Sequence, residues 1–156
     1  MAEYPGTENE RRFAYPALVD AVTAIFAGCG MSAEDARLLA DSLARADLRG
    51  IHSHGVMRVP DYVDKLTVGG VDPRGRPRVV RERLGAMVVD AGNAMGQIAA
   101  AFAMNLAIER ARQTGIAMVT VGGSNHCGAM DYWVRMAVNA GMIGIAATNA
   151  LPTMAP

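Results

Sequence analysis

Apolar side chains recur every three or four positions near the start of the chain, and this spacing predicts an amphipathic helix. Pro16 suits the first turn of such a helix, and Gly28 follows its last apolar residue. One face of the helix should therefore lie against a core. The apolar stripe consists of Leu18, Val22, Ile25 and Phe26.

Two further helices are predicted in the first half of the chain. Ser32 is a favourable N-cap residue, and Asp35 follows it by three positions, so a helix is expected from residue 33 to about Arg49. A short third helix is expected over residues 55–68, broken or bent near Pro60. The chain should therefore begin with a helical segment.

The pattern changes after this segment. Residues 78–84 and 86–90 predict two strands joined tightly at Gly85, in the manner of a hairpin. A long alanine-rich helix is predicted over residues 95–113, where the small side chains allow another element to pack closely.

Two short apolar runs, at residues 116–121 and 142–147, predict buried strands on either side of a helix over residues 129–139. This strand–helix–strand order predicts a βαβ unit and a parallel sheet. We therefore expect an α/β fold in which a helical N-terminal segment is followed by a mixed sheet. The chain stops soon after the second run, whereas a parallel sheet needs covered faces and further strands, so we expect it to be truncated.

Composition narrows the classes of function. The 156 residues are 51% hydrophobic and 19% charged, with 15 basic and 15 acidic side chains. Such a chain is too apolar for intrinsic disorder and lacks the positive charge of a general nucleic-acid binder or membrane-surface protein. No stretch approaches the roughly 18–20 apolar residues of a membrane span. Two cysteines and a polar N-terminus favour a cytoplasmic protein with free thiols.

The first candidate site lies between the second and third predicted helices. If residues 54–58 are helical, His54 and Arg58 share one face. Arg58 can hold a carboxylate with two parallel hydrogen bonds, and His54 can move a proton at a neighbouring oxygen. Ser53 either caps the helix or lines the same site. The spacing also fits a plain helix start with two partly solvated histidines.

A metal site is an alternative to this acid–base interpretation. His52 and His54 alternate along the segment, but zinc usually takes about three protein ligands and no third is evident nearby. A metal-dependent hydrolase that uses His52, His54 and His126 is a remaining alternative, and we expect no metal.

The second candidate site is the glycine-rich turn at residues 122–128, between a predicted strand and a predicted helix. Free N–H groups at a helix start attract anions, and His126 would lie at the sheet edge where α/β folds bind ligands. The spacing does not match a dinucleotide-binding G-x-G-x-x-G. Cys127 lacks a clear partner base, which argues against a cysteine nucleophile. A tight turn with a hydrogen-bonded histidine is the plain alternative. Residues 148–150 should lie beside the turn.

Several separated segments, in order, resemble the malate/L-lactate dehydrogenase family, which has a non-Rossmann cofactor fold. The similarity runs from about Phe13 to the last residue. The segments are A-D-L-R-G-I-H-S-H-G-V-M-R at residues 46–58, D-A-G-N-A-M-G-Q at residues 90–97, S-N-H-C-G-A at residues 124–129, and Thr148-Asn149 with Pro156.

The resemblance implies hydride transfer between NAD or NADP and a small-molecule 2-oxo or 2-hydroxy acid. Its alternative is reduction of a cyclic imino acid such as piperideine- or pyrroline-2-carboxylate. His54 and His126 would be the catalytic candidates, and the resemblance does not decide which one carries the proton. Arg58 would bind the substrate carboxylate beside Ser53. The cofactor would be approached by His126, Thr148, Asn149 and Ala150.

The resemblance also implies a homodimer and a division of the chain. We expect a tail at residues 1–12, part of a substrate and dimerisation domain at 13–115, and the start of an NAD(P)-binding domain at 116–156. Members of the family are longer, so several cofactor contacts should be missing and the chain alone should have weak or no activity. It would act with a C-terminal remainder of the same protein, or as a non-catalytic fragment that serves as an assembly partner.

Overall fold

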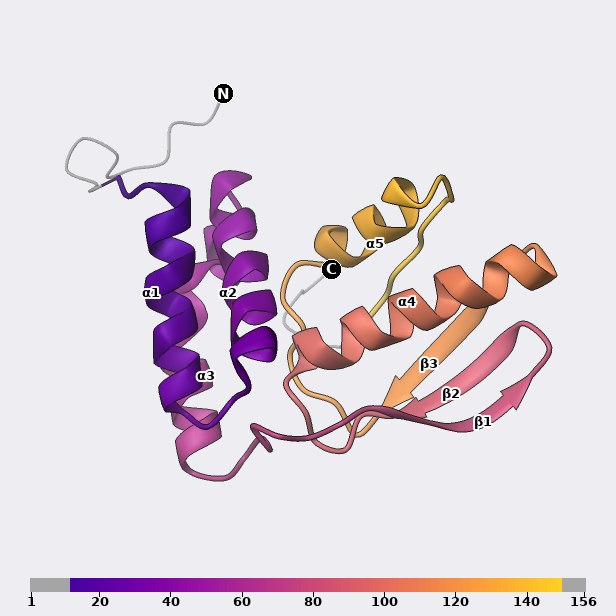
Figure 1. Cartoon of the computed structure of the whole chain (residues 1–156), viewed down its shortest axis with the longest axis horizontal. Helices are drawn as coiled ribbons and strands as arrows, with labels where there is room; N and C mark the ends of the chain where they lie inside the picture. Colours follow the sequence, from indigo (N-terminus) through magenta and orange to yellow (C-terminus); the bar gives the residue numbers. More distant parts are fainter. Residues whose placement is uncertain (1–11, 150–156) are drawn as a thin grey trace, which may run out of the picture.

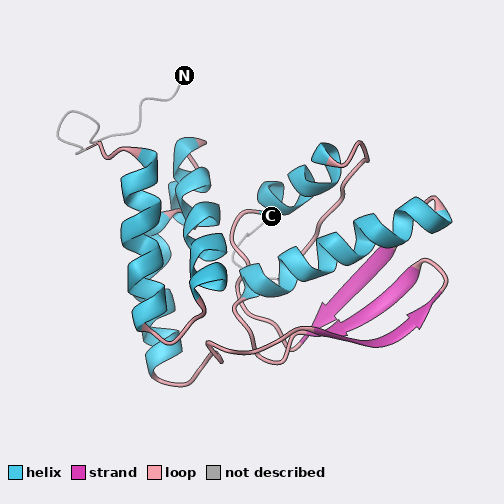
Figure 2. Cartoon of the chain, viewed as in Figure 1, coloured by secondary structure: helices cyan, strands magenta, loops and turns pink. Residues whose placement is uncertain are grey.

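A computed structural model describes residues 12–149 of the chain (Figure 1). Three helices stand side by side at one end, and a three-stranded sheet with two more helices forms the other end (Figure 2). The elements in order are α1 (Tyr15–Gly28), α2 (Ala33–Leu48), the 3-10 turns η2 (His52–His54) and η3 (Val56–Arg58), α3 (Val59–Thr67), β1 (Arg78–Arg83), β2 (Ala86–Asp90), α4 (Gly96–Thr114), β3 (Met118–Gly122) and α5 (Met130–Asn139).

Helices α1 and α2 form where the apolar spacing and the cap predict them. The Ser32 hydroxyl accepts a hydrogen bond from the Asp35 N–H at 3.1 Å, which confirms the predicted N-cap. Val22 and Phe26 are buried, but Ile25 is not. The buried face of α1 also includes Val19, which turns the face away from Ile25 and leaves that side chain at its edge. Residues 1–11 of the predicted tail lie outside the described residues.

The third helix corrects the prediction. It begins at Val59, so Pro60 stands in its first turn instead of breaking it. Proline is favourable there because its missing N–H has no partner inside the helix in any case. The preceding residues form η2 and η3, which meet at Gly55.

The sheet has the order β1-β2-β3, with β1 antiparallel to β2 and β2 parallel to β3. The predicted hairpin is confirmed. The parallel βαβ unit is made by β2, α4 and β3, and not, as predicted, by the two runs on either side of residues 129–139. Helix α4 covers one face of the sheet (Figure 1). On β2, the side chains of Met87 and Val89 are buried. Strand β3 is largely exposed and not buried as predicted, since the described residues place no element over its other face or its free edge.

The predicted strand at residues 142–147 was wrong, because these residues pair with no other strand among those that the structure describes. Their burial nevertheless alternates, with Gly144 against α5 and Ile143 and Ile145 exposed by 92% and 87%. The sequence has strand periodicity there, but no described neighbour supplies the ladder hydrogen bonds.

The main core lies within the helical layer and reaches the start of α4. Strands β2 and β3 lie on either side of the predicted domain boundary at residue 115 and pair in one sheet; the division into domains stays a prediction. Within residues 12–149, no helix combines the length and the apolar character that crossing a membrane requires.

Candidate active site

Asp47, near the end of α2, fixes the loop that carries the first two histidines. Its carboxylate accepts hydrogen bonds from the His52 Nδ1 at 2.9 Å and from the Val56 N–H at 2.8 Å. A Cβ atom at Gly55 would lie 1.9 Å from the Asp47 Oδ1, so the loop can approach this carboxylate only with glycine at position 55. Asp47 was not among the predicted site residues, although it lies within the first family-like segment.

His54 and Arg58 do not share one helix face, because the backbone between them forms two 3-10 turns instead of one α-helix. Arg58 is placed by a different contact: its Nε donates to the carbonyl oxygen of Ser53 at 2.6 Å. Its Nη1 donates to Asp61 at 3.1 Å. The Ser53 hydroxyl lies 2.9 Å from the His54 Nδ1. The loop thus brings Ser53, His54 and Arg58 together through one contact to the backbone and one between side chains.

His126 lies beside these residues and comes from the glycine-rich turn between β3 and α5. Its ring stacks on that of His54, with ring centres 5.4 Å apart and planes at 26°. Its Nδ1 lies 2.6 Å from the Tyr62 hydroxyl on α3, and the Gln97 Nε2 on α4 donates to that hydroxyl at 3.2 Å. Tyr62 and Gln97 were missed in the sequence, where only the G-Q pair of the second family-like segment marks one of them.

Burial and charge tune the groups around His126. Burial lowers the pKa of His126, and electrostatic interactions with His54 and Arg58 lower it further. Burial also raises the pKa of Tyr62 to about 12. Tyr62 therefore stays a neutral hydroxyl near pH 7, and the neutral form of His126 is favoured.

The turn that carries His126 is anchored on both sides. The Asn125 side-chain amide donates to the carbonyl oxygen of Ala94 at 3.0 Å, and the Trp133 Nε1 donates to that of Cys127 at 2.9 Å. Gly96 lies so close that a Cβ there would be 2.2 Å from the Asn125 carbonyl oxygen. The first turn of α4 and the first turns of α5 thus set the position of His126.

Residues 148 and 149 lie at the far side of the same turn. Burial raises the pKa of the Cys127 thiol, and a hydrogen bond with Thr148 opposes this in part. A raised pKa disfavours the thiolate that nucleophilic attack requires. Ser124, Thr148 and Asn149 are exposed, and their hydroxyl and amide groups can form hydrogen bonds with a polar ligand. Ala150 lies outside the described residues.

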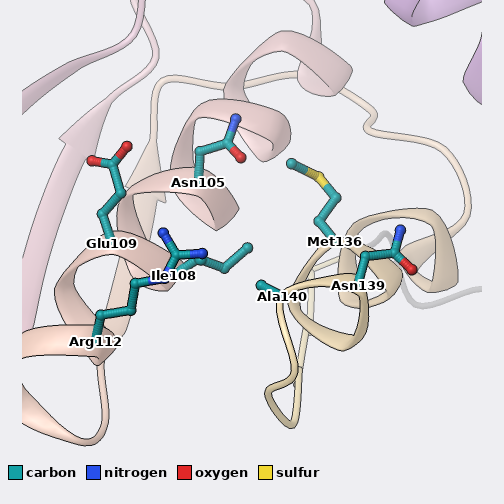
Figure 3. Close-up of a pocket in the computed structure, with 7 residues that line it drawn as sticks. All are labelled: Asn105, Ile108, Glu109, Arg112, Met136, Asn139 and Ala140. Atoms are coloured by element: carbon teal, nitrogen blue, oxygen red, sulfur yellow. The ribbon is translucent and has the colours of Figure 1, made fainter.

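Other features of the described chain do not coincide with this cluster. Among residues 12–149, no group of three His, Cys, Asp or Glu side chains is arranged to hold a metal ion. A hollow between α4 and α5 carries none of the three histidines (Figure 3). Its lining is Asn105, Ile108, Glu109, Arg112, Met136, Asn139 and Ala140.

The helical layer, the mixed sheet and a histidine pair beside an arginine define an α/β protein whose site can bind an anion and move a proton. The chain belongs to the malate/L-lactate dehydrogenase family, whose model matches residues 13–156. It is 43% identical over 149 residues to a malate dehydrogenase from Pyrococcus abyssi, covering 96% of this chain and 41% of that protein.

Two solved structures are similar in fold. One is the malate dehydrogenase from Pyrococcus horikoshii OT3, with a TM-score of 0.84 and 38% identity over 86% of this chain and 38% of that one. The other is the delta1-piperideine-2-carboxylate reductase from Pseudomonas syringae pvar. tomato, with a TM-score of 0.76 and 37% identity over 83% of this chain and 40% of that one. The chain therefore spans about 40% of the length of these relatives.

Proposed function

We propose that this chain supplies the substrate-binding and proton-transfer residues of an NAD(P)-dependent dehydrogenase that interconverts 2-oxo and 2-hydroxy acids. The observation that carries the proposal is the convergence of Arg58, His54 and His126. A guanidinium and two imidazoles are the groups that a small organic acid needs for binding and for proton exchange. The similarity to malate dehydrogenases supports a hydroxy acid as substrate.

Arg58 would hold the substrate carboxylate. Its Nε donates to the Ser53 carbonyl oxygen, which anchors the guanidinium before substrate binds, and its Nη1 pairs with Asp61 in a largely exposed contact that a substrate carboxylate could replace. The carboxylate would place the neighbouring carbonyl or hydroxyl oxygen by the histidine pair. There an imidazole donates a proton during reduction and takes it back during oxidation. The nicotinamide cofactor supplies or accepts the hydride when bound, near His126, Thr148, Asn149 and Ala150.

A cyclic imino acid is the second candidate substrate. The similarity to a piperideine-carboxylate reductase structure favours it, and the same arginine would hold its carboxylate. The proton would then go to a ring nitrogen instead of an oxygen. A substrate panel that contains both classes separates the two candidates.

The finer features of the enzyme are also part of the proposal. We propose that it uses NAD or NADP, works as a homodimer, and resides in the cytoplasm. The family resemblance supports the dimer. Free thiols at Cys29 and Cys127 are consistent with a reducing compartment. Analytical ultracentrifugation of the chain tests the dimer directly.

The experiment compares Arg58→Ala with Arg81→Ala, an arginine on the exposed strand β1. Binding of a panel of 2-oxo acids and cyclic imino acids is measured by calorimetry, and turnover is followed with NADH and NADPH. Loss of a charged hydrogen-bonding partner costs about 1.5–3 kcal/mol, so Arg58→Ala should weaken acid binding roughly 10–100-fold. Arg81→Ala should bind like the wild type. Equal affinities in the two variants would show that Arg58 does not hold the carboxylate.

A further inference from the structure

We propose that Tyr62 and Gln97 are positioning residues that hold His126 as its neutral tautomer, with the proton on Nε2. The chain of contacts runs from α4 through α3 to the glycine turn: Gln97 to Tyr62 at 3.2 Å, and Tyr62 to the His126 Nδ1 at 2.6 Å. What this tautomer does in the reaction rests on the function proposed above.

A backbone N–H group determines which atoms donate in these hydrogen bonds. The N–H of Gly128 points at the His126 Nδ1, with 3.4 Å between the two nitrogen atoms. A backbone N–H can only donate, so Nδ1 acts as an acceptor and carries no proton. The Tyr62 hydroxyl must then donate to Nδ1, and its oxygen is left to accept from the Gln97 amide. The hydrogen bonds from Gln97 to Tyr62 and from Tyr62 to His126 then both run toward the histidine.

The two residues that lead to His126 lie in the protein core. Gln97 is fully buried, and Tyr62 is buried under the ring of Phe26, with ring centres 6.4 Å apart. The Gln97 Oε1 is buried and has no hydrogen-bond partner among the described residues. A purely structural role at this position would be better filled by an apolar side chain of the same length. The amide is therefore explained by what its Nε2 does, which is to orient the Tyr62 hydroxyl.

This arrangement gives the two histidines different roles in the proposed reaction. With its proton on Nε2, neutral His126 can donate a hydrogen bond to a substrate oxygen but has no proton to release. Burial and the positive charges of Arg58 and Lys65 favour this neutral form by lowering the pKa of His126, and the Asp61 carboxylate opposes them. His54, whose Nδ1 faces the Ser53 hydroxyl, is then the imidazole that carries the proton.

The test is nitrogen NMR of the 156-residue chain labelled at histidine, with His126→Asn used to assign the signals. In the wild type, the Nδ1 of His126 should have the chemical shift of an unprotonated ring nitrogen at neutral pH. A protonated Nδ1 in the neutral ring would overturn the proposal. This result does not depend on turnover, so an inactive chain with the expected tautomer counts only against the proposed function.

Two variants then test the positioning residues. Gln97→Glu introduces a carboxylate that can only accept, so the Tyr62 hydroxyl should turn toward it and the His126 proton should move to Nδ1. Tyr62→Phe removes the donor to Nδ1, so the Nδ1-protonated form should become detectable and the pKa of His126 should rise. Gln97→Met, apolar and of similar length, controls for folding. An unchanged tautomer and pKa in both Gln97→Glu and Tyr62→Phe would show that these residues do not set the state of His126.

Discussion

The helical layer and the sheet differ in how completely they bury their own apolar side chains. In the helical layer, Phe26 and Leu43 are fully buried. In the sheet half, Ile116 and Ile143 are exposed by 78% and 92%. The helical layer thus forms most of its core from its own helices, with the start of α4 packed against them, whereas the sheet half leaves these apolar side chains in solvent. The histidine pair takes one member from each region, so the site depends on how firmly the two are joined.

The largest effect expected is on the core of the helical layer. Leu43→Ala removes a fully buried side chain and should lower the free energy of unfolding by about 2–5 kcal/mol. The matched substitution in the other region, Ile143→Ala, removes a side chain that is already solvated and should change it by less than about 0.5 kcal/mol. Urea unfolding followed by circular dichroism measures both. Similar losses in the two variants would remove the contrast between the regions.

The next effect concerns the contact between α4 and the turn that carries His126. Gly96→Ala places a methyl group 2.2 Å and 2.4 Å from the carbonyl oxygens of Asn125 and His126, and backbone cannot yield as a flexible side chain does. Overpacking of this kind costs about 1–3 kcal/mol. It should also separate the stacked rings of His54 and His126. Gly122→Ala is the control, since nothing lies within 4 Å of a Cβ there. Chemical shifts of the two histidines should move only in Gly96→Ala.

The carboxylate of Asp41, on α2, connects the helical layer with α5 in the sheet half. Asp41 accepts hydrogen bonds from Tyr132 at 2.6 Å, from Arg45 at 2.8 Å, and from Tyr15. Burial acts to raise the pKa of Asp41, but these three donors outweigh burial and hold the pKa below its usual 3.8. The ionised form therefore stabilises the fold above about pH 4, and this stabilisation is lost as the pH falls through the lowered pKa.

Asp41→Asn should accordingly lower the free energy of unfolding at pH 7 by about 1–2 kcal/mol, because it weakens a charge-assisted network. The difference from the wild type should shrink as the pH falls from about 4 through the lowered pKa of Asp41, below which the wild-type carboxyl is also neutral. Urea unfolding at pH 7 and pH 3 measures the difference. A gap that stays constant with pH would mean that the charge of Asp41 does not link the regions.

The smallest effect expected is at the edge of the site. The ion pair of Arg58 with Asp61 is largely exposed, and such pairs contribute about 0–1 kcal/mol. Asp61→Asn leaves the Arg58 guanidinium freer to meet a substrate carboxylate. Binding of a 2-oxo acid should therefore tighten by at most about 5-fold, measured by calorimetry. Weaker binding would indicate that Asp61 orients Arg58 instead of competing with the acid.

The helices, the hairpin and the glycine turn could be predicted from the sequence because their signals are local. Ser32, Gly85 and the apolar stripe of α1 act through neighbours a few residues away. The strand predicted at residues 142–147 was wrong, because pairing needs a partner strand that periodicity alone does not provide. His54 and Arg58 were brought together by Ser53 instead of by helix spacing.

The rest of the site could not be predicted because its contacts join distant parts of the chain. Tyr62 meets His126 across 64 residues and meets Gln97 across 35. Nothing in the residues around Tyr62 distinguishes it from an ordinary core tyrosine on an amphipathic helix. Asp47 and Gln97 lie within family-like segments, yet their partners become evident only once the loop and α4 are folded.

The fluorescence of Trp133 can report on ligand binding at this site. It is the single tryptophan of the chain, it is buried, and its indole N–H is bonded to the carbonyl oxygen of Cys127, next to His126. Any ligand that shifts the glycine turn must alter that bond and the surroundings of the indole ring. Intrinsic fluorescence of the unlabelled chain therefore reports on the occupancy of the site, with no second emitter of its kind to obscure the signal.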